Sequence, residues 1–305
     1  MKQFRCMNTQ ELVSVILPTY NRAHILSRAI ESVLRQSYQN IELIIIDDCS
    51  NDNTNEIVNS YLNKDKRLFY IRNERNAGAA YSRNVGIEYS RGIFLMFLDS
   101  DCEYLPEKIE KAIALMYALE PSPDVIYSNM WREQKDAETV LSSNIKDKLL
   151  TPEDIFNCKY HFLNPTAWFC RSGIIKKLGG FDKNIYSYDD IDLLIRVILS
   201  GGRIYFFNRP LSIKHSAAGI SDISFRTVVS KENFLRKHFS EIKKYKRFIS
   251  KLYYNLGKDL FRLGDFKKGK KYFWRAFISN PIKIEYLFKC ICLSLKNQDR
   301  ANKIE

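Results

Sequence analysis

The sequence predicts an α/β fold in which a mostly parallel, twisted sheet is flanked by helices and followed by an all-helical C-terminal appendage. Short apolar runs rich in β-branched and aromatic residues alternate with stretches of helical period. The runs are continuously apolar, which is typical of strands covered on both faces. From about Asp222 onward, the hydrophobic period is helical throughout.

Composition and cysteine usage bound the class of protein. The chain has 305 residues, of which 45% are hydrophobic and 27% charged, so disordered and fibrous classes are excluded. No run of about 18 apolar residues is present to span a bilayer. No apolar stretch of signal-peptide length precedes the first predicted strand at residue 13. The seven cysteines form no Cys-x-x-Cys pair. We therefore expect a cytoplasmic protein with reduced thiols.

The first half of the chain alternates predicted strands with predicted helices. Leu26, Ile30 and Val33 fall on one helical face between the first two apolar runs. Thr54–Leu62 and Ala77–Tyr89 supply the helices of the later crossovers. Because strands joined by a crossover helix run parallel, we expect a mostly parallel sheet. The predicted strands are residues 13–17, 42–46, 67–71 and 93–98.

The next elements begin at Pro106, which suits the first turn of a helix that runs to Leu119. A strand is predicted at residues 125–128, followed by a polar excursion to about residue 150. Asp189–Leu199 predicts an amphipathic helix whose N-terminal acids suit the positive end of the helix dipole. The remaining predicted strands are residues 165–171, 203–207 and 211–214.

Residues 253–281 resemble one helix pair of the tetratricopeptide type. No second copy is present in the sequence, whereas solenoids of this type need about three repeats. We therefore predict a packed helical appendage, with one domain at residues 1–221 and a second at 222–305. The residues at the spacing of the repeat are Leu256, Gly257, Gly264, Phe266, Phe273, Ala276 and Pro281, with Gly269 where a small Ala is usual.

The net charge of +13 resides in the C-terminal tail. Residues 1–230 carry 28 basic and 28 acidic side chains, whereas residues 231–305 carry 20 and 7. A basic tail on a neutral body suggests an anionic partner, either a membrane surface or nucleic acid, while a solvated Lys-rich helical face is the simpler alternative. The aromatic residues of the tail recur at helical spacing, which core packing explains better than nucleic-acid binding. We therefore expect no nucleic-acid partner.

Polar residues follow three of the predicted strands. The first strand runs into Pro18–Arg22, the second into Asp47–Ser50 and the fourth into Asp99–Asp101. In open α/β sheets, ligands bind beyond the carboxyl ends of the strands. An acid at a strand end can instead be a helix N-cap, but three such clusters at one edge favour a ligand site.

Asp99-Ser100-Asp101 forms an Asp-x-Asp element. Its two carboxylates can share Mg²⁺ or Mn²⁺ while open positions remain for phosphate oxygens, although such pairs are also common at turns that bind no metal. With Tyr20 to lie on a base and Asp48 to accept from a ring N–H, the clusters describe a nucleotide-diphosphate pocket. The sequence contains no glycine-rich phosphate loop, so the cation has to take the place of that loop.

The segments VSVILPTYNR, IELIIIDDCSNDNT, NAGAAYSRNVGI, FLMFLDSD, GGFD and YDDIDLLIR occur in this order. In order and spacing they closely resemble glycosyltransferase family 2, the inverting nucleotide-sugar transferases of GT-A fold. The resemblance covers residues 13 to about 221 and implies a GT-A-like catalytic domain, in agreement with the predicted strands. It also implies transfer of a sugar from a nucleotide-diphosphate sugar to an acceptor hydroxyl of a growing cell-surface glycan or lipid-linked saccharide.

The resemblance implies roles for single residues in donor binding. Tyr20 would lie against the base, with Asp48 on its ring nitrogen. Arg83 would lie near the diphosphate or the sugar, and Asp99 would contact the ribose or a metal. The family pattern around Asp48 favours uracil, so a UDP-sugar is the expected donor, although guanine and thymine also present a ring N–H. The nucleotide-binding residues expected in this way are Pro18, Tyr20, Asn21, Arg22, Asp48, Arg83, Asp99 and Ser100.

The resemblance also implies metal-binding and catalytic residues. Asp101 would bind Mn²⁺ or Mg²⁺ directly, with Asp99 and His215 as further ligands. Asp190 matches the catalytic base. The family's usual Glu before the base is Asp189 here, a shorter carboxylate, so the choice of base between the two acids stays open.

Two of these residues and the function as a whole have alternatives. His215 is equally explained as a histidine on a surface strand. Trp168 would line the acceptor face, whereas a half-buried core aromatic is the simpler explanation. The rival to a transferase is a catalytically inactive nucleotide-binding adaptor that docks through its basic tail. The acid at Asp190 disfavours the adaptor, because nucleotide binding alone does not require it. For the tail, we expect contact with anionic lipid on the inner face of the cell membrane.

Overall fold

The computed structural model describes residues 11–134, 137–140, 146–156, 164–185, 187–215 and 224–286. The chain divides into two compact units. The first comprises residues 1–150, 161–183 and 193–218, and the second comprises residues 151–160, 184–192 and 219–305. The second unit thus includes the C-terminal region together with two short segments that precede residue 222.

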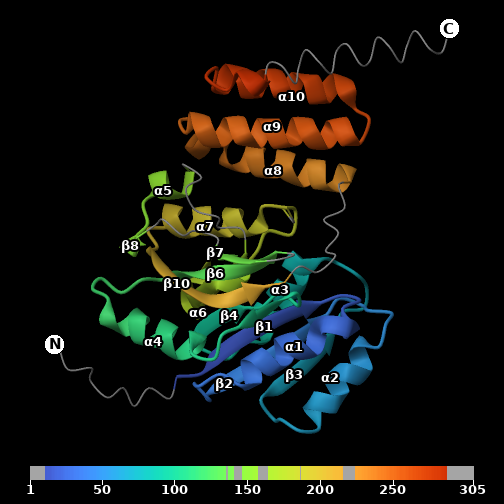
Figure 1. Cartoon of the computed structure of the whole chain (residues 1–305), viewed down its shortest axis with the longest axis vertical. Helices are drawn as coiled ribbons and strands as arrows, with labels where there is room; N and C mark the ends of the chain where they lie inside the picture. Colours follow the sequence, from blue (N-terminus) through green and yellow to red (C-terminus); the bar gives the residue numbers. More distant parts are fainter. Residues whose placement is uncertain are drawn as a thin grey trace. The chain divides into compact units, whose positions relative to one another are not determined.

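The first unit is built on a 10-stranded sheet (Figure 1). Along its main path the strand order is β3-β2-β1-β4-β9-β6-β10-β5, with β7 paired to β6 and β8 to β10. The strands are β1 (Val13–Thr19), β2 (Ile41–Asp47), β3 (Leu68–Arg72), β4 (Phe94–Phe97), β5 (Cys102–Tyr104), β6 (Val125–Gln134), β7 (Ala137–Val140), β8 (Lys148–Leu149), β9 (Trp168–Arg171) and β10 (Ile204–Lys214).

Parallel pairing joins the strands that carry the polar clusters. β1 runs parallel to β2 and β4, and β2 runs parallel to β3. In this register Thr19 of β1 lies opposite Asp47 of β2. The carboxyl ends of these strands therefore lie along one edge of the sheet. β10 is parallel to β6, while β5, β7, β8 and β9 pair antiparallel. The predicted fold class is confirmed, as a mixed sheet with a parallel centre.

Helices cover both faces of the sheet, as expected for strands that are buried along their whole length. Apolar residues of α1, α2 and α4 form one buried cluster with alternate residues of β1 such as Val15. The next residue, Ile16, points to the opposite face. There Gly86 of α3 packs so closely against Ile16 that a Cβ would not fit. The helices of this unit are α1 (Ala23–Leu34), α2 (Thr54–Leu62), α3 (Ala79–Tyr89), α4 (Lys108–Ala118) and α6 (Ser172–Lys177).

The structure differs from the predicted elements in the part of the sheet that follows β4. Residues 204–214 form the single strand β10, where the sequence predicts two strands. The ladder is irregular around Pro210, but the chain does not leave the sheet. The short strands β5, β7 and β8 have no counterpart in the prediction. They are too short to show a hydrophobic period, and their pairing with β6 or β10 decides their conformation.

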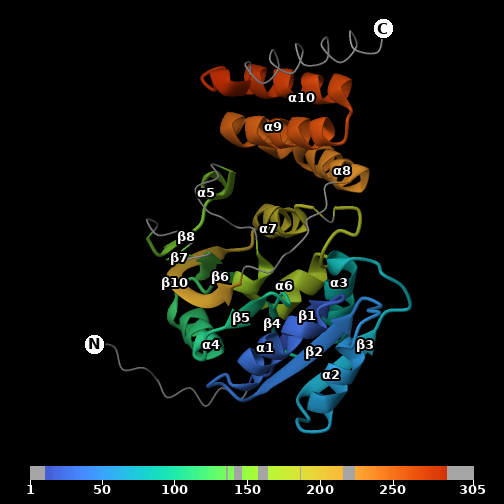
Figure 2. The same cartoon turned by 45° about the vertical axis from the view of Figure 1, so that its right-hand side comes forward.

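The second unit contains helices that stack side by side, with α9 packed against both α8 and α10 (Figures 1 and 2). A Cβ at Gly257 of α9 would lie 2.9 Å from the Phe273 ring, and one at Gly269 of α10 would lie 3.2 Å from the Gly257 carbonyl oxygen. These glycines let the two helices approach closely, in the segment that resembles a tetratricopeptide pair. The helices are α5 (Pro152–Phe156), α8 (Phe225–Ile242), α9 (Lys246–Arg262) and α10 (Phe266–Ser279).

Among the described residues, no helix combines the length and the apolar composition that crossing a bilayer requires. The helix α7 (Asp189–Leu199) begins in the second unit and continues in the first.

A lysine is buried in the first unit. Lys108 of α4 is 1% exposed, and its Nζ donates to Ser128 Oγ at 3.0 Å. The same Nζ lies 5.0 Å from the centre of the Tyr104 ring. Burial lowers the pKa of Lys108 from 10.5 to about 7, because apolar surroundings disfavour the charged ammonium.

This lysine predicts a pH-dependent term in stability. Between pH 7 and 10.5 the unfolded chain keeps a proton on Lys108 that the folded chain releases, so this residue makes stability rise with pH. In Lys108→Met the titration is absent, and the variant should be more stable than the wild type by an amount that shrinks as pH rises. Denaturant unfolding of both proteins, below pH 7 and at about pH 9, measures this difference in the free energy of unfolding. A difference that stays constant with pH would contradict the lowered pKa.

Candidate functional site

A pocket of about 310 Å³ lies at the carboxyl ends of β1, β2 and β4 in the first unit. It gathers side chains that are far apart in the sequence, since parallel strands bring their ends to one edge. Every residue expected to bind nucleotide lines it except Asn21. The lining residues are Pro18, Thr19, Tyr20, Arg22, Asp48, Ala79, Ser82, Arg83, Asp99, Ser100 and Asp101.

Asn21 instead ties two loops together beside the pocket. Its backbone has a φ of 50°, a left-handed conformation that Asn adopts more readily than most residues. The Asn21 N–H donates to Ser50 Oγ at 2.9 Å, and the Asn21 Oδ1 accepts from the Asn51 N–H at 2.8 Å. The loop after β1 is therefore held against the loop after β2, which places Tyr20 and Arg22 on the pocket wall.

Asp48 joins the pocket to the start of α3. One of its carboxylate oxygens accepts from Asn73 Nδ2 at 2.8 Å and from the Ala77 N–H at 3.0 Å, and the other accepts from the Gly78 N–H at 2.7 Å. Gly78 has a φ of 90°, which suits glycine, so its N–H can turn toward Asp48. Three of the roughly four acceptor positions of the carboxylate are thus in use.

Arg83 and Asp99 form a partly buried ion pair on the pocket wall. The Arg83 Nη2 lies 2.8 Å from Asp99 Oδ1, and the guanidinium is centred 5.3 Å from the Phe181 ring. The Asp99 N–H donates to Thr166 Oγ1 at 3.0 Å, which fixes the start of the Asp-x-Asp element. These contacts hold a guanidinium and a carboxylate side by side at the end of β4.

Lys214 faces Asp101 from the end of β10. Its Nζ lies 3.4 Å from Asp101 Oδ2. Burial opposes protonation of this lysine, but the carboxylates of Asp101 and Asp99 outweigh the burial and raise the pKa of Lys214. Sequence reasoning missed this residue. The antiparallel pairing of β10 with β5, in which Lys214 lies opposite Cys102, brings it here.

His215 lies near the Asp-x-Asp element through its backbone only. Its N–H donates to the Asp101 carbonyl oxygen at 3.0 Å. Its imidazole faces two other acids, with Nδ1 2.8 Å from Glu133 Oε2 and Nε2 3.3 Å from Glu103 Oε1. Within the described residues, the ring therefore contacts Glu103 and Glu133 rather than the side chain of Asp101.

The two carboxylates of the Asp-x-Asp element suit a hard cation. Asp99 and Asp101 both line the pocket and offer oxygen ligands, the type that Mg²⁺ and Mn²⁺ prefer. Across the described parts of the chain, no group of three or more His, Cys, Asp or Glu side chains is arranged to hold a metal by itself. The donor set therefore fits an ion that takes its other ligands from water and a bound diphosphate.

Trp168, expected on the acceptor face, lies in the core. Its side chain is fully buried, and its ring lies parallel to that of Phe181 at 6.2 Å and edge-on to that of Phe97 at 6.2 Å. Its indole N–H has no hydrogen-bond partner among the described residues. This placement matches the core-packing alternative, and we assign Trp168 to the interior.

Asp189 and Asp190 lie in the second unit, in the first turn of α7. Asp190 is 7% exposed, and its Oδ1 accepts from the Ile191 N–H at 2.7 Å. The turn before them is unusual, because Tyr188 has a φ of 78°. Left-handed backbone at a residue with a large side chain is costly and is often found at functional sites.

Helices of the second unit hold this turn from several sides. The Ser187 N–H donates to Ser230 Oγ of α8 at 2.9 Å, and the Tyr188 hydroxyl accepts from Asn255 Nδ2 of α9 at 3.1 Å. Asp192 is fully buried, and its Oδ1 lies 2.7 Å from His238 Nε2. The acids at the start of α7 are therefore fixed to the C-terminal helices.

Comparison with known proteins identifies the family. The model of the family described as Glycosyl transferase family 2 matches residues 14–179. Glycosyltransferase GlyG of Streptococcus pneumoniae serotype 4 is 36% identical over 221 residues, which cover 68% of this chain and 72% of GlyG. The Escherichia coli protein named UDP-Glc:alpha-D-GlcNAc-diphosphoundecaprenol beta-1,3-glucosyltransferase WfaP is 30% identical over 249 residues, which cover 80% of this chain and 92% of WfaP.

Other similarities are shorter or lie in the fold alone. Relatives at 38% to 46% identity are matched over 42% to 53% of their own length, about half. The crystal structure of S. aureus TarS 1-349 in complex with UDP-GlcNAc aligns with a TM-score of 0.61 at 20% identity and covers 84% of this chain and 89% of that one. This likeness shows a common fold. The family match spans more than half of the chain, and the chain belongs to glycosyl transferase family 2.

Proposed function

We propose that the protein is an inverting hexosyltransferase that moves a sugar from a UDP-sugar to an acceptor hydroxyl of a growing cell-surface glycan or lipid-linked saccharide. The observation that carries this proposal is a pocket that gathers an exposed aromatic, two arginines and three carboxylates at the strand ends of a family 2 chain. The names of WfaP and its Escherichia coli counterpart WfgD give UDP-Glc and a diphosphoundecaprenol-linked saccharide.

For the uracil base, we assign the side of the pocket formed by Tyr20, Asp48 and Thr19. The Tyr20 side chain is 42% exposed and offers a face for stacking. The remaining acceptor position of Asp48 suits a ring N–H. The Thr19 hydroxyl is buried on the pocket wall without a hydrogen-bond partner among the described residues, which suits a polar group of the ligand.

For the diphosphate, we assign the side of the pocket formed by Arg83 and the Asp-x-Asp element, with Lys214 beside Asp101. The two cations can stabilise the negative charge that develops on the departing UDP. Asp99 and Asp101 would hold Mn²⁺ or Mg²⁺, which supplies Lewis-acid stabilisation of the same charge. We leave His215 out of the metal site because its ring faces Glu103 and Glu133.

For the chemical step, we assign the general base to Asp190, with Asp189 as its neighbour. The acceptor oxygen attacks the anomeric carbon as Asp190 takes its proton, and the bond from that carbon to the phosphate oxygen breaks to release UDP. Because this is a single displacement, the configuration at the anomeric carbon inverts, by the stereochemical logic that holds for glycosidases.

We place this reaction at the cytoplasmic, inner face of the cell membrane. A lipid-linked acceptor is held in that surface, and the basic C-terminal region carries the charge that attracts anionic headgroups. The first unit binds the donor in this scheme, and the C-terminal helices meet the membrane.

Asp101→Asn should abolish the part of UDP affinity that depends on Mn²⁺, because an amide is a weaker ligand than a carboxylate. Metal-free UDP binding should not weaken, since Lys214 loses its contact with the Asp101 charge and can meet the diphosphate. Calorimetric titration with UDP, GDP and TDP, with and without Mn²⁺, measures both effects and identifies the nucleobase that the pocket prefers. Asp65→Asn, which changes an acid outside the pocket, is the control.

Two results of this titration would contradict the assignments. An Asp101→Asn variant whose UDP affinity still rises with Mn²⁺ would remove Asp101 from the metal site. A wild-type protein that binds none of the three nucleotides would overturn the proposed donor class.

Asp190→Asn should bind UDP as the wild type does while transfer falls by about 10²- to 10⁴-fold, the usual contribution of a general base. Asp189→Asn changes the neighbouring acid in the same way and serves as the matched comparison. Single-turnover transfer from a radiolabelled UDP-sugar, with UDP affinity measured in parallel, separates the chemical step from nucleotide binding. Unchanged transfer in Asp190→Asn with a large loss in Asp189→Asn would give the role to Asp189.

A further inference from the structure

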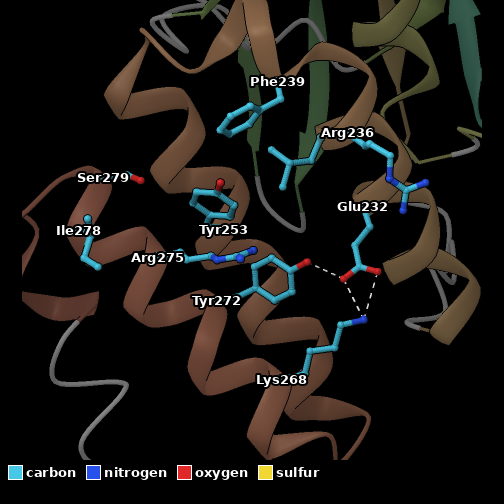
Figure 3. A pocket seen from close by; sticks show the side chains of 10 residues that line it. Glu232, Arg236, Phe239, Tyr253, Lys268, Tyr272, Arg275, Ile278 and Ser279 are labelled. Carbon is cyan, nitrogen blue, oxygen red and sulfur yellow. Dashed lines mark hydrogen bonds and ion pairs between the residues drawn. The ribbon is translucent and has the colours of Figure 1, made fainter.

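A groove of about 800 Å³ lies on the helices of the second unit (Figure 3). On one side, α8 contributes four residues of one helical face, which are Glu232, Leu235, Arg236 and Phe239. On the other side, α10 contributes Lys268, Tyr272, Arg275, Ile278 and Ser279. Tyr253 of α9 lies between them. None of these residues belongs to the donor pocket.

The polar end of the groove is internally satisfied. The Tyr272 hydroxyl donates to Glu232 Oε1 at 2.5 Å, and the Lys268 Nζ lies 2.9 Å from the same oxygen. Burial raises the pKa of Tyr272, and the Glu232 carboxylate raises it further, so the phenol remains a neutral donor. Glu232 and Lys268 therefore cancel each other's charge (Figure 3).

Two guanidinium groups in the groove remain uncompensated. Arg275 stacks over the rings of Tyr253 and Tyr272, at 6.0 Å and 5.6 Å from their centres. Arg236 is held by a hydrogen bond to Asn233 Oδ1. Within the described residues neither arginine has a carboxylate at ion-pair distance, so the lining of the groove carries a net positive charge that suits an anion.

The other end of the groove is apolar and open to solvent. Phe239 is 45% exposed and Ile278 is 60% exposed. Apolar side chains left in water beside cations are typical of surfaces that enter the headgroup region of a membrane. Further exposed apolar side chains of the same unit are Phe225, Val229, Trp274, Ile282 and Ile284.

We propose that this groove binds the headgroup of an anionic phospholipid, with the phosphate attracted by Arg236 and Arg275 and the adjoining hydrocarbon against Phe239 and Ile278. A free anion would use the two cations but leave the apolar side chains in water. An acidic peptide would likewise leave the apolar rim around the groove uncovered. The site deepens the membrane partner named in the proposed function and does not depend on transfer activity.

Arg236→Gln/Arg275→Gln should weaken binding to vesicles of phosphatidylcholine with phosphatidylglycerol by about 30-fold, at about 1 kcal/mol for each basic side chain near the surface. Arg247→Gln/Arg262→Gln removes the same charge from exposed positions of α9 outside the groove and should cost much less. Arg236→Lys/Arg275→Lys keeps the charge and should restore binding. Co-sedimentation of the full chain measures all four proteins, with circular dichroism to verify folding.

Several outcomes would overturn this site. Equal losses in the two glutamine pairs would mean that diffuse charge binds the membrane. Inorganic phosphate that binds to the wild type as tightly as soluble dihexanoyl-phosphatidylglycerol would assign the groove to a free anion. Binding of polyglutamate, dependent on both arginines and without binding to vesicles, would assign it to an acidic protein. Because no nucleotide or sugar is present, a failure here leaves the proposed transferase activity untouched.

A second, independent observation concerns His238. It is 3% exposed, and its Nε2 meets Asp192 Oδ1 at 2.7 Å, with the Lys237 Nζ 2.8 Å from the same oxygen. Asp192 lies one residue beyond Ile191, in the turn that carries Asp190. We infer that His238 is a positioning residue, which holds the first turn of α7 so that Asp190 is correctly placed. This role rests on the proposed function of Asp190.

His238→Ala should lower kcat by about 10- to 100-fold while the KM for the donor and UDP affinity stay unchanged, because a small displacement of a base is costly. His238→Gln keeps an N–H donor and should restore most of the loss. His24→Ala, at an exposed position of α1, is the matched control. In a double variant that combines His238→Ala with Asp190→Asn, the two losses of kcat should not add.

The outcomes distinguish the positioning role of His238 from the proposed transferase function. Wild-type protein without measurable transfer would refute the proposed function itself. Wild-type transfer with an unchanged kcat in folded His238→Ala, or additive losses in the double variant, would refute only the positioning role. A fall in melting temperature alone would mark His238 as structural.

Discussion

The parallel register of β1 with β2 and β4 is the constraint on which the candidate site depends. It brings the ends of three strands to one edge, so that loops separated by dozens of residues form one wall. The loops then hold one another. Asn21 links the first two, and Asp48 links the second to the start of α3. The position of each polar group in the pocket is therefore set by the sheet and by a few hydrogen bonds between loops.

Charge in the pocket is balanced before any ligand binds. Arg83 neutralises Asp99, and Lys214 lies against Asp101. Two carboxylates so close together at the end of a strand would repel each other without these cations. A diphosphate with its metal can exchange partners with these groups, because the ligand brings both negative and positive charge. The same pairs would therefore suit the charged donor of the proposed function.

The C-terminal helices have more than one role in the second unit. They fix the turn before α7 through Ser230 and Asn255 and the first turn of α7 through His238. They also form a groove whose two arginines have no carboxylate at ion-pair distance among the described residues. The close packing of α9 on α10 at Gly257 and Gly269 gives this region a defined shape. A helix pair that resembles a single tetratricopeptide repeat thus acts as a scaffold rather than as part of a solenoid.

The sequence by itself determined the parallel centre of the sheet, the C-terminal helices and most of the pocket. Continuous apolar runs identify buried strands, and acids directly after them identify the edge where the pocket lies, because both features are local. Tertiary structure decided the rest. Lys214 reaches Asp101 only through the pairing of β10 with β5, and the His215 ring turns to Glu103 and Glu133. The contact between Asp192 and His238, and the burial of Trp168, likewise depend on long-range packing, which no local pattern encodes.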